Sequence, residues 1–387
     1  MAAAEVGGVV LVINGKNKRF ADGMPAIAHR RCSTRRFPLL LPLATIEDAL
    51  ALARIKSENR AMPELIGIAR MAAQSNLLEA KGHASAPVEY FEIEARSILN
   101  RTKPNMPFQW TINPYRGCEF GCHYCYARYT HEFMGMQNGR DFESKIYAKA
   151  AAPGFLRREL RRLDRADRIA LGTATDPYQP AERRFGRTRA ILEVFAAEKG
   201  RHLSITTKSD LVTRDIDLLR EIARRNVLAV NVTVTTLNRR LARLLEPRAP
   251  RPDLRLGAVR TLTEAGIAAG VFPNPILPMI TDSDESLDAL AAAARQAGAQ
   301  YFGGGPLFLM PSAQKIFFPI LEQHLPKLAG PYRKLYATGA YLGPGYKAQL
   351  RERLARIRER YGLAAAPVEY HPELWEGEEQ GTLFPIQ

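Results

Sequence analysis

Three cysteines within eight residues are the side chains of this sequence best suited to chemistry. Cys118, Cys122 and Cys125 form a C-x3-C-x2-C pattern on a short loop that contains Gly121, whereas Cys32 is isolated. Three thiolates on such a loop can bind three irons of a cubane [4Fe–4S] cluster and leave the fourth iron open to a small molecule. An open iron implies chemistry at the cluster rather than simple electron storage.

The same cysteines are also compatible with zinc. Together with His123 or His131 they would form a Cys₃His site of ordinary composition. A structural zinc site would make folding depend on the metal, so that Cys122→Ala would unfold the chain instead of only abolishing turnover. Both interpretations remain open at this point.

The elements that position the cysteine loop follow a regular pattern. β-rich runs alternate with amphipathic segments of helical length. The predicted strands are 110–115, 169–173, 203–207, 227–235, 267–272 and 300–302. The predicted helices are 155–163, 187–198, 216–225, 254–265 and 286–297. Since such units close by right-handed crossovers, we predict an α/β fold, a partial parallel (β/α)6 barrel with N- and C-terminal extensions.

Four segments are expected along the chain. Residues 1–105 form an N-terminal extension with one helix at 46–71, and 106–305 form the barrel core. Residues 306–370 form a C-terminal extension with a basic helix at 346–361, and 371–387 form an acidic tail. That tail has no Lys or Arg, which is typical of a flexible segment.

Polar residues follow the second and third predicted strands. Thr175 and Asp176 come after the second strand, and Lys208 comes after the third. In parallel α/β barrels, chemistry gathers at the carboxyl ends of the strands. Taken alone, these residues would be read as turn and cap residues, but their place beside a cysteine loop favours contact with a cofactor.

The cysteine pattern after a first barrel strand resembles that of the radical S-adenosylmethionine (SAM) superfamily. This resemblance implies that the open iron takes the amino and carboxylate groups of SAM. Reduction of the sulfonium then gives methionine and a 5′-deoxyadenosyl radical, which abstracts a hydrogen atom. It also implies that Tyr124, the aromatic residue before the third cysteine, packs near the cofactor.

A closer resemblance, over 113–305, is to the spore photoproduct lyase-like branch of that superfamily. It rests on Cys-His-Tyr-Cys-Tyr at 122–126, Thr-Asp at 175–176, Thr-Lys-Ser at 207–209 and Asn-Val-Thr-Val-Thr-Thr at 231–236. It implies that a DNA lesion is the substrate.

The same resemblance implies which residues contact SAM. Thr175 and Asp176 would lie near the cofactor, and Lys208 would reach its carboxylate. Asn231 or Thr233 would meet its polar end or its ribose.

Tyrosines are the catalytic residues that the resemblance implies. Tyr124 and Tyr126 would flank the cofactor, and Tyr126 matches a tyrosine of the hydrogen-atom relay in the lyases. Bacterial spore lyases carry a hydrogen-donating cysteine at the end of the second strand, where Thr173 stands here. A threonine O–H bond is too strong for that role, so another hydrogen source or another substrate is expected.

Composition bounds the class of protein. The chain has 387 residues, 46% of them apolar and 25% charged, as in a globular protein with a large core. It has no apolar run near the ~20 residues of a membrane span and no secretory signal pattern. A cytoplasmic location without membrane attachment is therefore expected.

A formal charge of +15 predicts a polyanionic partner such as nucleic acid, and the resemblance to the lyases implies that this partner is DNA. Two arginine groups follow the second and fourth strands and are expected to border the substrate entrance. They are Arg183, Arg184, Arg187 and Arg189, and Arg239, Arg240, Arg243, Arg248, Arg251 and Arg255. Gln380, Leu383 and Phe384 in the tail resemble a motif that docks on the bacterial sliding clamp. An electron donor is a further expected partner.

These observations predict a radical SAM enzyme that acts on nucleic acid, with a lyase-like reaction on a DNA lesion. One alternative keeps the radical chemistry but applies it to RNA or to a small or peptidic substrate. The other is a non-enzymatic binding protein for nucleic acid or the clamp, stabilised by zinc or a cluster.

Overall fold

The computed structural model describes residues 76–83, 86–104, 106–150 and 152–367, all within the compact unit Glu64–Gln387. Four sequence predictions therefore lie outside the described residues. They are the single cysteine Cys32, the helix at 46–71, the acidic tail and the clamp-like motif at Gln380, Leu383 and Phe384.

A six-stranded sheet forms the centre of the molecule, in the order β10-β9-β8-β7-β4-β3. β4 to β10 in this sheet run parallel, and only β3 pairs antiparallel, with β4. The bounds are β3 Leu99–Arg101, β4 Trp110–Ile112, β7 Arg168–Leu171, β8 His202–Thr207, β9 Val227–Thr233 and β10 Ala269–Phe272. A parallel bridge between Val271 and Phe302 adds the sixth predicted strand position. The predicted partial (β/α)6 barrel is thus confirmed.

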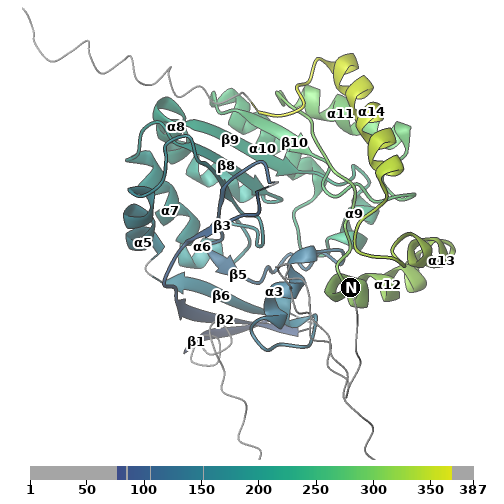
Figure 1. Ribbon diagram of the computed structural model, residues 1–387, viewed down its shortest axis with the longest axis horizontal. Coiled ribbons are helices and arrows are strands. Elements are labelled where there is room, and N and C mark those ends of the chain that lie inside the picture. The colour runs from purple at the N-terminus through teal and green to yellow at the C-terminus, as the bar shows by residue number, and fades with distance from the viewer. Residues whose placement is uncertain (1–75, 84–85, 105, 151, 368–387) are drawn as a thin grey trace, which may run out of the picture. The chain divides into compact units, whose positions relative to one another are not determined.

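Helices cover this sheet because its strands are apolar on both faces, as parallel strands are when crossover helices flank them. Figure 1 shows α5, α7 and α8 along one side of the sheet. The covering elements are α5 Ala152–Leu160, α6 Glu182–Phe185, α7 Arg187–Ala196, η2 Asp210–Asp215, α8 Ile216–Arg225, α9 Arg239–Leu245, α10 Pro252–Glu264 and α11 Asp284–Gln296. The bounds of α8 coincide with the prediction, and those of the other predicted covering helices lie within a few residues.

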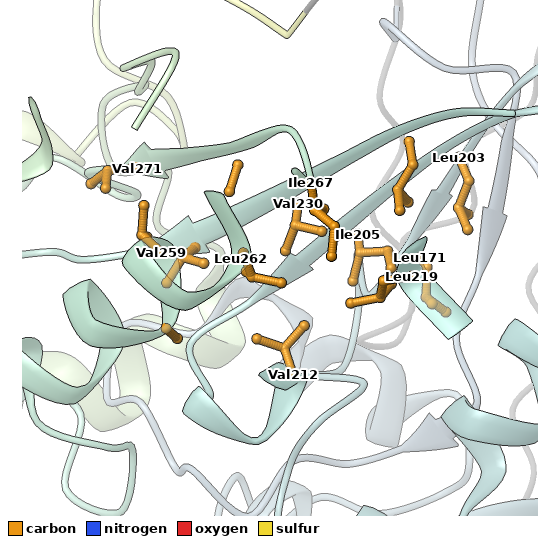
Figure 2. Packing of buried hydrophobic residues seen from close by; sticks show 14 of the residues in the cluster. Leu171, Leu203, Ile205, Val212, Leu219, Val230, Val259, Leu262, Ile267 and Val271 are labelled. Atoms are coloured by element: carbon orange, nitrogen blue, oxygen red, sulfur yellow. The ribbon is translucent and has the colours of Figure 1, made fainter. Parts of the chain in front are cut away.

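The main core lies between the strands and these helices. Figure 2 shows its packing around β8, β9 and β10. Leu203, Ile205 and Val230 from the strands are fully buried, as are Leu219 of α8 and Leu262 of α10. Burial of this apolar surface is the main free energy that holds the strand ends in fixed register.

A second, smaller sheet includes strands that the sequence pattern did not predict. Its order is β1-β2-β6-β5, with β2 parallel to β6 and the other pairs antiparallel. The strands are β1 Asn76–His83, β2 Ala86–Glu94, β5 Tyr115–Arg116 and β6 Lys145–Ala150. Because β2 and β3 both pair with strands of the predicted core, part of the segment 1–105 belongs structurally with that core.

Three helices follow the barrel: α12 Pro311–His324, α13 Pro326–Leu335 and α14 Pro344–Tyr361. Each begins with a proline in its first turn, where the missing N–H costs no helical hydrogen bond. α14 contains the predicted basic helix and ends at Gly362, whose φ of 60° suits a helix C-cap. In the described part of the chain, no helix is long and apolar enough to cross a membrane.

Candidate functional site

A cavity of about 710 Å³ lies at the carboxyl ends of the parallel strands. Its walls include Thr173 after β7, Lys208 after β8, Thr233 at the end of β9 and Phe272 at the end of β10. Cavities of ~300–1,000 Å³ are typical of small-molecule and cofactor sites. The predicted catalytic face of the barrel is therefore hollow.

The three cysteines converge on this cavity. Cys118, Cys122 and Cys125 all line it, and the first two are 8% exposed. They lie on the loop between β5 and η1 Tyr126–Arg128, which continues into α3 Tyr129–Glu132. Burial raises the pKa of each thiol, that of Cys122 to about 12. Iron that replaces the thiol protons would remove this cost, so the donor set fits a cluster.

Neither histidine of the zinc alternative lines the cavity. The His131 ring packs against Phe142 and Tyr147, with centroids 5.3 and 5.9 Å away, and its Nε2 lies 3.1 Å from the carbonyl oxygen of Lys145. Among the described residues, the Cys₃His alternative therefore has no histidine at the cavity that the three cysteines line.

The start of the cysteine loop is fixed by donors to the carbonyl oxygen of Gly117. Thr175 Oγ1 donates to this oxygen at 2.6 Å and Gln179 Nε2 at 3.1 Å. Gly117 has φ of 80°, and an added Cβ would lie 2.7 Å from the carbonyl oxygen of Lys145. Only glycine fits this turn without strain. Thr175, predicted to lie near SAM, does line the cavity, but its hydroxyl is used to hold the loop.

Arg128 holds the other side of the loop. Its guanidinium donates to the carbonyl oxygens of Cys122 at 2.9 Å and Gly139 at 2.6 Å, and it pairs with Glu143 at 2.5 Å. Its side chain is fully buried. α4 Asp141–Ser144 carries Glu143, so the loop is tied to a neighbouring helix. No sequence pattern indicates this role, because an isolated arginine is normally interpreted as a surface residue.

Arg248, grouped with the entrance arginines in the sequence, also supports the loop. Its main-chain N–H donates to Phe120 O, and its guanidinium donates to Glu143 O, each at 3.3 Å. The expectation that Arg248 contacts phosphate is therefore corrected, because its charged group turns toward the cysteine loop.

Asp176 joins the ends of the second and third barrel strands. Its carboxylate accepts from Thr207 Oγ1 at 2.6 Å and from the main-chain N–H groups of Lys208 at 2.7 Å and Tyr178 at 2.9 Å. Burial raises the pKa of Asp176, although these hydrogen bonds favour its charged form. Asp176 lines the cavity and fixes the backbone that presents Lys208.

Lys208 is the cation of the cavity wall predicted to meet a carboxylate. Its Nζ lies 3.7 Å from Glu246 Oε1 and donates to Asn274 O at 3.3 Å. It also lies 6.0 Å from the centre of the Tyr124 ring. These contacts hold the ammonium group beside the cysteine loop.

Glu246 is the centre of a buried network that the sequence did not reveal. Its carboxylate accepts from the hydroxyls of Tyr124 and Thr235 and pairs with Arg255 at 2.6 Å. Burial raises the pKa of Glu246, but Arg255 and Lys208 outweigh it and lower the value to about 2. Glu246 is therefore ionised and fixes both Tyr124 and Lys208.

Arg255 was also predicted to border the substrate entrance, and this expectation is corrected. Its side chain is 1% exposed. Besides pairing with Glu246, it donates to the carbonyl oxygen of Thr233 at 3.1 Å. The buried carboxylate of Glu246 holds it inside the protein, although nothing in the local sequence pattern marks Glu246 as buried.

Asn231 and Thr233 on β9, both predicted to contact SAM, have different positions relative to the cavity. Thr233 lines the cavity, whereas Asn231 does not. The Asn231 amide donates to Thr206 Oγ1 at 3.1 Å and accepts from the Tyr301 hydroxyl at 2.8 Å. Asn231 thus positions Thr206, which is itself part of the cavity wall.

Tyr124 and Tyr126 both line the cavity. The Tyr124 hydroxyl is engaged by Glu246, and the Tyr126 hydroxyl donates to the main-chain oxygen of Thr173. Burial raises the pKa of both phenols, so both are protonated near neutral pH. Thr173 accepts from Asn113 Nδ2 at 3.2 Å and places a hydroxyl, not a thiol, at this strand end.

Five arginines were predicted to border the substrate entrance as a basic rim, and some of them are exposed while others pair with acidic side chains. Arg183 and Arg184 on α6 and Arg239 and Arg240 on α9 are exposed. Arg239 lies 3.4 Å from Asp253, and Arg187 pairs with Glu92 of β2. None of these five arginines is among the residues that line the cavity.

Comparison with known proteins gives a consistent picture. The family model described as Radical SAM superfamily matches residues 112–292. An uncharacterized protein of Mycobacterium tuberculosis is 38% identical over 307 residues, which cover 78% of this chain and 87% of that relative. An uncharacterized protein of Methanocaldococcus jannaschii is 32% identical over 199 residues, which cover 51% of this chain and 71% of that relative.

Solved structures of spore photoproduct lyase share the fold. One mutant with a dinucleoside spore photoproduct has a TM-score of 0.54 at 18% identity, and another with bound AdoMet and that photoproduct has 0.54 at 17%. Each alignment covers 71% of this chain and 80% of the lyase chain.

The matched segment contains the cysteine loop and the strand ends that form the cavity. Its three cysteine side chains fit the cluster on which this superfamily depends. From the family model and the mycobacterial relative we conclude that the chain belongs to the radical SAM superfamily, whose members use a [4Fe–4S] cluster and S-adenosylmethionine.

Proposed function

We propose that this radical SAM enzyme acts on nucleic acid, with a damaged DNA base as its substrate and a lyase-like reaction. Cys118, Cys122 and Cys125 hold the cluster in this proposal. When bound, the reduced cluster and SAM supply a 5′-deoxyadenosyl radical that abstracts a hydrogen atom from the substrate.

Side chains at the ends of different strands would orient SAM. Lys208 supplies the charge that a carboxylate requires, and Glu246 keeps its ammonium group in place. Thr233 and Asp176 offer polar groups on the same wall. Tyr124, held by Glu246, packs beside the cofactor in this proposal.

Apolar side chains keep water away from the reacting atoms. Phe120, Phe142, Leu307 and Phe308 line the cavity. A radical that abstracts hydrogen reacts with whatever lies nearby, so an apolar wall limits side reactions.

Tyr126 is the proposed catalytic tyrosine. In the described part of the chain the cysteines are Cys118, Cys122 and Cys125, all assigned to the cluster. Since Thr173 cannot replace a thiol donor, the Tyr126 hydroxyl, which donates to the main-chain oxygen of Thr173, is the hydrogen source that we propose. One electron from the electron donor of the cluster and one proton from water would restore the phenol afterwards.

The observation that carries the choice of substrate is the position of the exposed arginines. Arg183 and Arg184 follow the cavity-lining loop after β7, and Arg239 and Arg240 follow the end of β9. With a net charge of +15, they suit the phosphates of a strand that delivers one base to the cavity. The fold shared with spore photoproduct lyase supports the same choice.

The test begins with the anaerobically reconstituted, dithionite-reduced protein. We expect an electron paramagnetic resonance signal of [4Fe–4S]⁺ that SAM shifts, and formation of 5′-deoxyadenosine. Ultraviolet-irradiated DNA, irradiated RNA and undamaged DNA are then compared by mass spectrometry of the nucleosides. Loss of a photoproduct only from DNA supports the proposal. Cleavage of SAM with no change in any nucleic acid would contradict the substrate and favour a small or peptidic one.

A further inference from the structure

Five aromatic rings from three separate segments form a continuous path past the cavity. Phe133 contacts Tyr129, and Tyr129 contacts Tyr126, with ring centroids 5.6 and 6.4 Å apart. Tyr126 then contacts Phe308 at 4.6 Å, and Phe308 stacks on Tyr341 at 5.5 Å. We call these five residues the aromatic path.

The aromatic path is partly buried in its middle and exposed at both ends. Tyr126, Tyr129 and Phe308 line the cavity. Phe133 and Tyr341 are 65% and 64% exposed, the largest values among the large hydrophobic side chains of the described residues. Core packing explains the middle rings, but it does not explain two aromatic side chains left in water at the ends of the same path.

The chemistry of the ends suits the flat faces of nucleobases. Every base presents a π-face, so exposed aromatic side chains bind unpaired strands whatever their sequence. Lys347 Nζ lies 5.5 Å from the centre of the Tyr341 ring, where a cation can both favour stacking and attract a phosphate. The positive charge of the chain is complementary to a nucleic-acid strand and not to an apolar partner.

We propose that the aromatic path is the binding surface for an unpaired nucleic-acid segment. Bases on either side of the reacting nucleotide stack on Phe133 and Tyr341, and the reacting base enters the cavity beside Tyr126, Tyr129 and Phe308. This inference rests on the proposed function for its substrate class and adds that the recognised form is a single strand or a locally unpaired site, read by stacking.

The test uses the reconstituted full-length protein and a short single-stranded deoxyoligonucleotide that contains 2-aminopurine. Phe133→Ala and Tyr341→Ala are each expected to raise Kd by roughly fivefold to a hundredfold, because one stacked base is lost. The slope of log K against log salt is expected to remain unchanged, because phosphate contacts are retained. Quenching of the 2-aminopurine fluorescence is expected to weaken in both variants.

Matched variants separate stacking from general apolar contact. Tyr341→Phe keeps the ring and is expected to bind like wild type, whereas Tyr341→Leu keeps apolar surface without the ring and is expected to bind like Tyr341→Ala. Leu254→Ala, at a 43% exposed site on α10, is the control with no expected effect. Thermal unfolding of each variant shows that the fold is retained.

The outcomes distinguish this inference from the proposed function. Salt-dependent binding by wild type with unchanged Kd in Phe133→Ala and Tyr341→Ala would overturn the aromatic path and leave the nucleic-acid substrate standing. Equal losses in Tyr341→Phe and Tyr341→Leu would also overturn it, since the hydroxyl and not the ring would matter. Absence of any oligonucleotide binding by wild type would overturn both.

Discussion

The two halves of the cavity are held in different ways. The cysteine loop is fixed by side chains that donate to main-chain oxygens, as Thr175 and Arg128 do to Gly117 and Cys122. The Lys208 half is fixed by buried carboxylates, above all Glu246 with Arg255. The first arrangement leaves every thiol free for a metal, and the second places fixed charge where a zwitterionic cofactor is proposed to bind. The predictions below test this division.

The largest effect is expected for the loop itself. Cys122→Ala should lose the cluster, its paramagnetic signal and 5′-deoxyadenosine formation down to background, because the other thiols of the described residues, Cys118 and Cys125, are themselves assigned to the cluster. Iron and sulfide analysis, with circular dichroism for the fold, measures this. Cys32→Ala is the control and should keep full iron content. Global unfolding of Cys122→Ala with zinc in the wild-type protein would instead support a structural metal.

In the charged half, Glu246→Gln should cost about 3–5 kcal/mol in the free energy of unfolding, because Arg255 and Lys208 lose a buried counter-charge. Urea unfolding measures the cost. Glu221→Gln removes an exposed partner of Arg224 and should cost less than about 1 kcal/mol. Equal costs for the two variants would show that the buried carboxylate stabilises the fold no more than an exposed one does.

The same carboxylate predicts a dependence of stability on pH. The pKa of Glu246 falls from 4.5 to about 2 on folding, so folding favours its ionised form. Its contribution, on the order of 3 kcal/mol, is complete above about pH 4.5 and is lost as the pH falls towards 2. Between these pH values, the free energy of unfolding should therefore fall more steeply with decreasing pH for wild type than for Glu246→Gln. Parallel curves would contradict the lowered pKa.

Binding of SAM should separate the two halves directly. Lys208→Met is expected to raise the Kd of SAM by about tenfold to a hundredfold, because a charged contact is lost. Thr175→Val removes the hydroxyl that donates to Gly117 and accepts from Gln179, and should cost about 1–2 kcal/mol of stability, with less than a twofold change in Kd. Calorimetric titration measures the Kd of SAM for both variants. The reverse ranking would make Thr175 the cofactor contact.

The smallest effect is expected outside the cavity. Arg183→Gln combined with Arg240→Gln should lower the slope of log K against log salt for DNA by about 2, if each arginine contacts one phosphate. Iron content and SAM binding should not change. Arg224→Gln, at an exposed site near the end of α8, is the control. An unchanged slope would remove these arginines from the proposed interface.

Local pattern was sufficient for the barrel and for the cysteines. The period of apolar residues predicted α8 at its observed bounds and predicted the parallel strands in order, because strands and amphipathic helices are encoded by neighbours in sequence. The spacing of Cys118, Cys122 and Cys125 on one loop likewise predicted that they would share a cavity.

Long-range packing decided the rest. Arg128, Arg248 and Arg255 look like surface cations in the sequence, yet the fold supplies the inward acceptors that hold them. The small sheet arises because β2 pairs with β6, about 55 residues further along the chain.

The sequence by itself therefore determined the cofactor loop and the order of the strands, since both depend on residues close together in the chain. Only the tertiary structure decided that Glu246 would hold Tyr124 and Lys208, and that Tyr341 would extend the path of rings from Tyr126 through Phe308. The physical reason is that the role of a buried charge or an aromatic ring depends on the group that it contacts. These partners come from segments that only folding brings together.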